Sequence, residues 1–453
     1  MFDFFFIRQS YDFYGINDYF YGRNNCRFGY IDTGLRMFFF IRFNRFLIAL
    51  VSALIMLLFS CGVRCMSILS VKVFNGLLIF DSIRFYLIIL VLLLGFYRQI
   101  MFYNVLSDGV RVYLFFRLGF TVLSFCVNHC IIFWVVYELS MLPLLYLIFR
   151  ESPYSERFLA GWYFCSYLLR TSLPLILVLL YLSVIKDSLL FRDWKYEGSV
   201  YLIVYYLLSF IFFTKVPLVP FHTWLPIVHA EATSIVSIFL RGYIMKLGLL
   251  GVYRCVSFIF NDGFLWYLFL CCALSVSFLI VSCSELDGKR WLAFLSLAHI
   301  VVPFLGFFIG DWSSINFSFF YCLGHGLSAG IVFGLLWYFY DVSHSRKWIL
   351  LKSSIKGVSL MMIVVFSLLS LCSFPITVQF FCEVGLVRQR FGFLVYLIFW
   401  CFYLFFGGLV PLVLCGHLLI RREYYECIDT CYYSHLHFLV FLCLWCYFGI
   451  LVL

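Results

Sequence analysis

The chain has 453 residues, of which 65% are hydrophobic and only 12% are charged, and its mean hydropathy is +1.04. Apolar runs recur from about residue 38 to the last residue, which is not the composition of a soluble domain. The formal net charge of +10 is modest for such a chain and gives no indication of nucleic-acid binding. The composition predicts a polytopic membrane protein.

The membrane crossings can be placed from the apolar runs, because one helical crossing needs about 20 residues. The runs predict about 12 to 14 transmembrane helices. Their expected centres lie near residues 50, 90, 120, 140, 172, 208, 243, 274, 300, 326, 366, 405 and 444, and one more span fits before residue 38. The loops between them are too short for a separate domain, so we expect one all-α membrane domain.

Residue usage is skewed toward amino acids with T- and G-rich codons, including 59 Phe, 32 Tyr and 19 Cys. The N-terminus carries neither a cleavable secretory signal nor an amphipathic transit peptide. We therefore expect an organelle-encoded protein.

The same codon bias explains most of the cysteines, which lie singly in apolar runs and act there as small hydrophobic residues. One group near the last span has ligand chemistry: Cys427, Cys431, His435 and His437. Its spacing matches no common zinc pattern, and we expect no metal there.

The most informative charged residue for function is Lys215, which lies in a segment broken by prolines. Lys215 is followed by Pro217 and Pro220 inside what otherwise reads as a lipid-embedded helix. A charge at the bilayer centre costs ~2.5–3.5 kcal/mol, and proline frees backbone carbonyls that are tolerated only inside protein or beside water. Lys215 is thus expected to face a hydrated interior next to a broken helix. A similar break is expected at Pro375, before Glu383.

Ionisable residues inside the apolar runs form a series that could pass protons through waters if the helices pack together. In chain order they are Glu138, Lys215, Lys246, His299, His325 and Glu383. Each also has a purely structural reading, because a carboxylate and a lysine can pair within a bundle and histidines hydrogen-bond across helices. Six such residues together with two broken segments favour a proton-passing role over the structural reading. Two broken helices far apart in one chain are typical of an inverted-repeat transporter.

The motifs around these residues carry a resemblance. They are Tyr137-Glu138-Leu-Ser-Met-Leu-Pro143, Lys215-Val-Pro217, Pro220-Phe-His222-x-Trp224-Leu-Pro226-x-x-His229-x-Glu231, Lys246-Leu-Gly248, His325-Gly-Leu-Ser328 and Pro375 to Glu383. In this order they resemble the antiporter-like subunits of mitochondrial NADH:ubiquinone oxidoreductase (respiratory complex I), in particular the subunit-4 branch of that family. The resemblance runs from about residue 80 to about residue 420. Residues 1–60 match poorly, so we expect a divergent N-terminal region there, with the first helix or helices, and the antiporter-like domain over residues 61–453.

The resemblance implies two inverted repeats, each with a discontinuous helix. Glu138 would modulate Lys215, Lys246 would be the central relay base, and His325 with Glu383 would form the exit half. Secondary candidates for the relay are His222, His229, Glu231 and His299. These roles imply proton translocation within a larger complex.

The resemblance also implies that this chain has no cofactor of its own. NADH, FMN, iron–sulfur clusters and ubiquinone would be bound by partner subunits. The expected partners are other membrane-arm subunits of complex I, sibling antiporter-like subunits among them, and membrane lipids. The expected location is the mitochondrial inner membrane.

The sequence departs from the family at several positions. Thr233 stands where the family has proline, and Arg241 replaces a small residue five positions before Lys246. Arg117 and Arg170 also lie in apolar runs. Arginine cannot release its proton, so we expect these side chains to snorkel, pair with carboxylates or bind lipid headgroups. Arg241 is expected to point away from Lys246, because five positions along an α-helix turn about 140°.

Two other classes of protein stay open. A multisubunit cation/proton antiporter shares much of the signature, but it would need a sodium site of carboxylates and carbonyls where this chain has lysines. A membrane subunit binding haem or quinone would need paired histidines on facing helices. His299 and His325 lie one per helix without a second pair.

Overall fold

The computed structural model describes residues 72–74, 76–97, 99, 102, 106–152, 154–194, 201–256, 259–260, 264–351, 355, 357–389, 394–420 and 432–452. All of them belong to the unit Cys61–Leu453. The expected N-terminal region, its division from the rest at residue 60, and the span near residue 50 involve residues 1–60, which lie outside the described residues.

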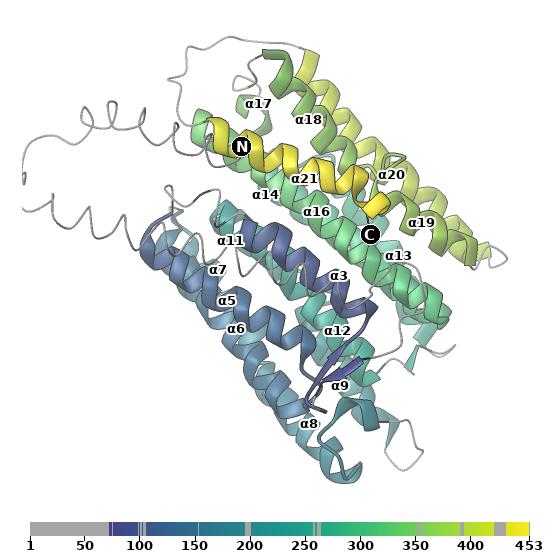
Figure 1. The fold of residues 1–453 in the computed structure, drawn as a ribbon. Coiled ribbons are helices and arrows are strands. Elements are labelled where there is room, and N and C mark those ends of the chain that lie inside the picture. The colour runs from purple at the N-terminus through teal and green to yellow at the C-terminus, as the bar shows by residue number, and fades with distance from the viewer. Residues whose placement is uncertain are drawn as a thin grey trace, which may run out of the picture. The chain divides into compact units, whose positions relative to one another are not determined.

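Eight of the described helices are long and apolar enough to cross a membrane, and four shorter apolar helices accompany them (Figure 1). The long ones are α5 (Asp108–Cys126), α6 (Cys130–Glu151), α7 with η3 and α8 (Arg157–Phe164, Cys165–Leu169, Ser172–Ile185), α11 with η5 and α12 (Ser234–Phe239, Leu240–Ile244, Met245–Val256), α13 (Leu265–Ser282), α14 with α15 (Gly288–His299, Val301–Ile309), α16 (Trp312–Ser343) and α20 (Leu394–Ile420). The shorter apolar stretches are Ser82–Gly95, Leu202–Lys215, Val358–Leu371 and His435–Ile450. They lie in α3 continued by η2 (Ser82–Val91, Leu92–Phe96), in α9 (Leu202–Lys215), in α18 (Gly357–Leu371) and in α21 (Tyr432–Val452). The prediction of a polytopic all-α membrane fold is confirmed.

The remaining described elements are short. They are α10 (Trp224–Glu231), α19 (Val378–Gln389), α17 (Trp348–Leu351), η4 (Phe191–Asp193), and the strands β1 (Lys72–Phe74) and β2 (Leu78–Phe80). The two strands form an antiparallel hairpin in which Val73 lies opposite Ile79. This hairpin is a small addition to the expected all-helical fold.

The order of helices repeats once along the described chain. One unit consists of α5, α6, α7–α8, α9 with α10, and α11–α12, and the next consists of α13, α14–α15, α16, α18 with α19, and α20. The fourth member of each unit is discontinuous. Because five crossings end on the side opposite to where they begin, the second unit enters the membrane in the inverted orientation. The predicted inverted repeats with discontinuous helices are therefore confirmed.

Both breaks lie at the predicted prolines. α9 ends at Lys215, and α10 begins nine residues later at Trp224, whose indole donates to the carbonyl oxygen of Thr214 (3.0 Å). This bond satisfies a carbonyl that the ended helix leaves free. α18 ends at Leu371 and α19 begins at Val378. Between them Ile376 has a φ of 85°, a conformation that β-branched residues rarely adopt.

The long helix α16 lies at the centre of the packing and is buried along its membrane span. It packs against α3, α11, α15, α19 and α21. Gly324 permits the contact with α19, because a Cβ at that position would lie 2.9 Å from the backbone nitrogen of Gln379. The close approach lets Ser328 of α16 donate to Oε1 of Gln379 on α19 (3.3 Å).

Candidate functional site

The first part of the site is a buried ion pair at the first break. Lys215, the last residue of α9, is fully buried, and its Nζ lies 3.4 Å from Oε1 of Glu138 on α6. The same Nζ lies 3.9 Å from the centre of the Tyr137 ring, so the cation also rests on an aromatic face. On the opposite side α12 passes closely, because a Cβ at Gly248 would lie 3.4 Å from Cβ of Lys215. The structure thus pairs the acid and the base that the sequence suggested.

The second part is a pair of buried cations on α12 and η5. Nζ of Lys246 donates to the carbonyl oxygen of Arg241 (2.9 Å). The guanidinium of Arg241 donates from Nη1 to the carbonyl oxygen of Leu292 (3.0 Å), and its Nε lies 3.4 Å from Nε2 of His325. Neither Lys246 nor Arg241 is exposed.

The expectation that Arg241 points away from Lys246 is therefore wrong. The reason is the π-helical turn η5, Leu240–Ile244, which precedes α12. In a π-turn the backbone bonds join residues five apart, so α-helical spacing does not apply, and the Arg241 guanidinium lies buried beside His325. The 140° separation holds only for a continuous α-helix.

The third part is a pair of contacting histidines. The rings of His299, at the end of α14, and His325, on α16, have centroids 5.2 Å apart. Nδ1 of His299 is hydrogen-bonded to the hydroxyl of Tyr403 and lies 3.2 Å from that of Tyr321. The two tyrosine hydroxyls are 3.0 Å apart. The histidines are thus joined to a buried pair of phenols.

Glu383 closes the series on α19. Its Oε1 accepts hydrogen bonds from Ser373 (2.8 Å), Gln379 (3.1 Å) and Tyr403 (3.5 Å). Gln379 also donates to the hydroxyl of Tyr321 (3.3 Å). Buried polar groups need such partners, and here the partners come from the break, from α19 itself and from α20. Glu383 is only 2% exposed.

Together these contacts connect Lys246 to Glu383. The connection runs from Lys246 through Arg241, His325 and His299 to Tyr403, and from there to Glu383. Lys215 and Lys246 lie on the packed helices α9 and α12, and no direct hydrogen bond joins them within the described residues. The structure therefore contains one buried acid–base pair and one longer polar series beside it.

The secondary candidates differ in their position. His229 is fully buried and stacks on Phe333 with centroids 5.3 Å apart, and its ring nitrogens have no hydrogen-bond partner among the described residues. The guanidinium carbon of Arg241 lies 6.0 Å from the same Phe333 ring, so His229 adjoins the series. His222 lies in the break after α9 and contacts Phe278. These two histidines have no direct bond to the series in the described part of the chain.

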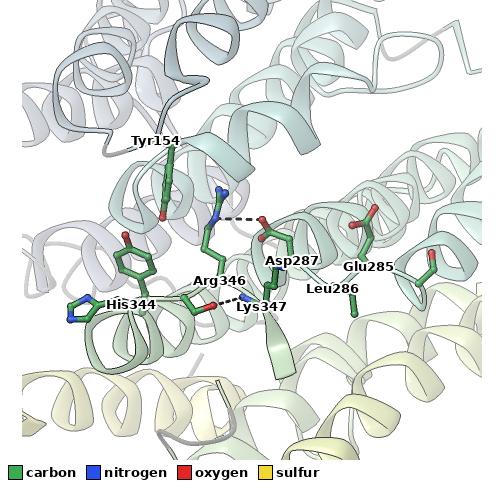
Figure 2. A pocket seen from close by; sticks show the side chains of 10 residues that line it. Tyr154, Glu285, Leu286, Asp287, His344, Arg346 and Lys347 are labelled. Atoms are coloured by element: carbon green, nitrogen blue, oxygen red, sulfur yellow. Dashed lines mark hydrogen bonds and ion pairs between the residues drawn. The ribbon is translucent and has the colours of Figure 1, made fainter. Parts of the chain in front are cut away.

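Glu231 belongs to a charged region where α10, α14 and α16 begin or end. Its Oε1 lies 3.5 Å from Nη1 of Arg346, whose Nε lies 3.6 Å from Asp287. Figure 2 shows Arg346 between Asp287 and Tyr154 at the wall of a cavity of about 540 Å³, and the guanidinium lies 4.1 Å from the Tyr154 ring centre. Burial raises the pKa of Tyr154 above its ordinary value, so its phenol stays protonated.

A buried lysine that the motifs did not single out bonds to Tyr154 of this cavity wall. Nζ of Lys289 donates to the carbonyl oxygen of Ala232 (2.7 Å) and to the hydroxyl of Tyr154 (3.3 Å). Lys289 and Arg346 also line a smaller adjoining cavity. In the sequence, Lys289 stands in the run Asp287-Gly-Lys-Arg290, which reads as a solvated helix boundary. Its 3% exposure could not be predicted from that run.

The other arginines divide into two cases. Arg117 is fully buried and donates to the carbonyl oxygens of Ser140 (2.9 Å) and Phe239 (3.2 Å). The expectation that it snorkels, pairs with a carboxylate or binds a headgroup is therefore wrong, because two backbone carbonyls and nearby aromatic rings satisfy it inside the bundle. Arg170 is exposed, and its snorkelling or headgroup binding stays a prediction.

Two further sequence features have local explanations. Thr233, in place of the family's proline, is the N-cap of α11 and its Oγ1 accepts from the backbone nitrogen of Val236 (3.5 Å). His435 lies 3.3 Å from Asp341. Cys427 and Cys431 lie outside the described residues, so the absence of a metal at that group stays a prediction.

Fold and site define a class: a helical membrane protein built like a transporter, with two discontinuous helices and buried acids and bases beside them. The profile of the family described as NADH:quinone oxidoreductase/Mrp antiporter, TM, matches residues 127–409. Because this is more than half of its length, the chain belongs to that family.

Individual relatives agree with this assignment. The chain is 32% identical over 238 residues to NADH-ubiquinone oxidoreductase chain 4 of Locusta migratoria, a match that covers 51% of this chain and 53% of that protein. The chain thus spans 53% to 63% of the length of the curated relatives it matches.

Two solved structures share the fold. A chain of respiratory complex I from Thermus thermophilus has a TM-score of 0.73 at 17% identity, covering 88% of this chain and 90% of that one. A chain of the Mrp complex from a Dietzia species has a TM-score of 0.71 at 14% identity, covering 86% and 78%.

Proposed function

We propose that this chain is a proton-translocating membrane-arm subunit of respiratory complex I. The observation that supports this most strongly is the buried series from Lys246 to Glu383, together with the Glu138–Lys215 pair beside it. Every member except Arg241 can bind and release a proton or pass one through a hydroxyl or ring nitrogen. Charged groups inside a membrane mark proton and ion pathways.

The discontinuous helices support the same function. Each break leaves polar backbone groups next to an ionisable residue, which is how membrane transporters hold ions near the midplane. Lys215 ends the first half-helix, and Glu383 lies in the half-helix that follows the second break. Protonation of Lys215 depends on the distance to Glu138, so a movement of either helix changes the charge at this position.

In this function the chain uses no cofactor of its own. NADH oxidation with FMN and iron–sulfur clusters, and reduction of ubiquinone, take place in partner subunits. The partners are the other membrane-arm subunits, including sibling antiporter-like subunits, and membrane lipids. The location is the mitochondrial inner membrane.

A cation/proton antiporter is the second candidate, because the family includes Mrp antiporters. Sodium is a hard cation that prefers several oxygen ligands. The groups gathered at the centre of the described site are instead a lysine, an arginine and two histidines. This chemistry favours protons over metal cations.

Substitution of Lys246 tests the proposed function. Lys246→Met keeps the bulk without a proton, and Lys246→Arg keeps the charge but cannot release it. In the assembled complex both variants should lower proton pumping and the coupled quinone reduction, while NADH oxidation with artificial acceptors stays intact. Each proton moved works against ~2.3 kcal/mol per 100 mV, so a relay base has to change protonation reversibly. Normal pumping by an assembled Lys246→Met complex would reject the proposal.

A further inference from the structure

Arg241 lies between Lys246 and His325 in the polar series. It is the one member of the series that cannot carry a proton. Its carbonyl oxygen accepts from Lys246, and its guanidinium contacts His325. A guanidinium does not give up its proton in a protein, so Arg241 cannot serve as a relay group. The most direct connection between Lys246 and the histidines therefore passes a permanent positive charge.

Nothing in the described part of the chain neutralises this charge directly. The partners of Arg241 are the carbonyl oxygen of Leu292 and the ring nitrogen of His325, and its Nη2 has no partner. No carboxylate of the described residues lies within 4.0 Å of its nitrogens. In a buried site the field of such a charge is screened much less than at the surface.

We propose that Arg241 is an electrostatic gate between the two halves of the path, and this rests on the proposed function. Its fixed positive charge opposes a positive charge on His325, which the guanidinium contacts, and on Lys246, which bonds to its carbonyl oxygen. A proton therefore passes from Lys246 to His325 only against this repulsion. When the complex is idle, the same charge keeps protons from running back through the path.

A purely structural role is the competing explanation, and Arg117 shows what it looks like. Arg117 is also fully buried and also donates to two backbone carbonyl oxygens, but it contacts no histidine or lysine of the series. The two arginines are therefore matched in burial and in carbonyl partners. They differ in whether a relay group lies next to the charge.

The experiment measures passive proton flux in liposomes that contain the assembled complex, with a trapped pH-sensitive dye and an imposed potential but no NADH. Arg241→Gln keeps hydrogen-bond donors for Leu292 and His325 without the charge, and its flux should rise at least about tenfold over the native complex. Arg241→Lys, which restores a positive charge, should leak less than Arg241→Gln. The control Arg117→Gln should stay as tight as the native complex.

Three results would overturn the proposal: an Arg241→Gln complex as tight as the native one, an Arg241→Lys complex that leaks as much as Arg241→Gln, or equal leaks from Arg241→Gln and Arg117→Gln. If neither Arg241→Gln nor Arg241→Ala assembles, the residue has a packing role and the proposal is likewise rejected. The leak is measured without turnover, so it is independent of the pumping assay on Lys246 that tests the proposed function.

Discussion

Tyr403 allows a test of the exit half that uses a residue found only in the structure. Its hydroxyl lies between Nδ1 of His299 and Oε1 of Glu383, and it also contacts the hydroxyl of Tyr321. Tyr403→Phe removes this hydroxyl and keeps the ring, whose centroid lies 5.4 Å from the ring centroids of both Phe399 and Trp400. The substitution should therefore interrupt the path and leave the packing of α20 intact.

The size of the effect follows from the bonds that are lost. A hydrogen bond to an ionised group contributes about 1.5–3 kcal/mol, and Tyr403 is the direct bridge from His299 to Glu383. If that free energy appears in the barrier, proton transfer at this step slows by about 10- to 150-fold. The remaining route passes from Tyr321 through the amide of Gln379, which is a poorer carrier than a hydroxyl.

The assay is proton pumping driven by NADH in liposomes, alongside NADH oxidation with an artificial acceptor. Tyr403→Phe should lower pumping and coupled quinone reduction and leave the artificial-acceptor rate unchanged. Tyr396→Phe is a matched control on the same helix, because its hydroxyl donates to the backbone carbonyl of Leu386 (2.8 Å). A Tyr403→Phe complex that pumps like the Tyr396→Phe complex would refute the path through this hydroxyl.

Two more predictions concern the other parts of the site. Glu138→Gln removes the ion pair with Lys215, in which the charges lie 3.4 Å apart and attract each other by about 5 kcal/mol at an effective dielectric of 20. Pumping by an assembled complex should therefore fall at least tenfold. Unchanged pumping would show that the pair is only structural. Lys289→Met leaves the carbonyl oxygen of Ala232 and the hydroxyl of Tyr154 without their donor, and it should slow pumping several-fold if the cavity admits protons. An assembled Lys289→Met complex with native pumping would separate the cavity from the path.

The sequence predicted the membrane fold and both breaks because these depend on strong local signals. Apolar runs of crossing length mark the helices, and Pro217 and Pro220 mark the end of α9. The contact between Lys215 and Glu138 was also within reach, since two opposite charges inside lipid-facing runs have few other partners.

The exit half was only partly predictable, because its connectors are neutral residues brought together from distant helices. Tyr321, Gln379 and Tyr403 lie on α16, α19 and α20. With 32 tyrosines in the chain, nothing distinguishes two of them before the helices are packed. The prediction of the Arg241 orientation was wrong for another reason. The π-turn η5 leaves no clear sequence signal, and it changes which residues share a helix face.

The signs of the two outer charges fit the side of the break on which each residue stands. Lys215 is the last residue of α9, at the C-terminal end of a half-helix, where the partial negative charge of the backbone favours a cation. Glu383 lies in the second turn of α19, beyond the second break, where Ser373, Gln379 and Tyr403 donate hydrogen bonds to its carboxylate. One break thus holds a lysine at the end of its first half-helix, and the other holds a glutamate in its second half-helix. From Lys246 to His299 the series carries groups that are cationic when protonated, so a proton leaving Lys246 meets repulsion at Arg241 and then attraction toward Glu383.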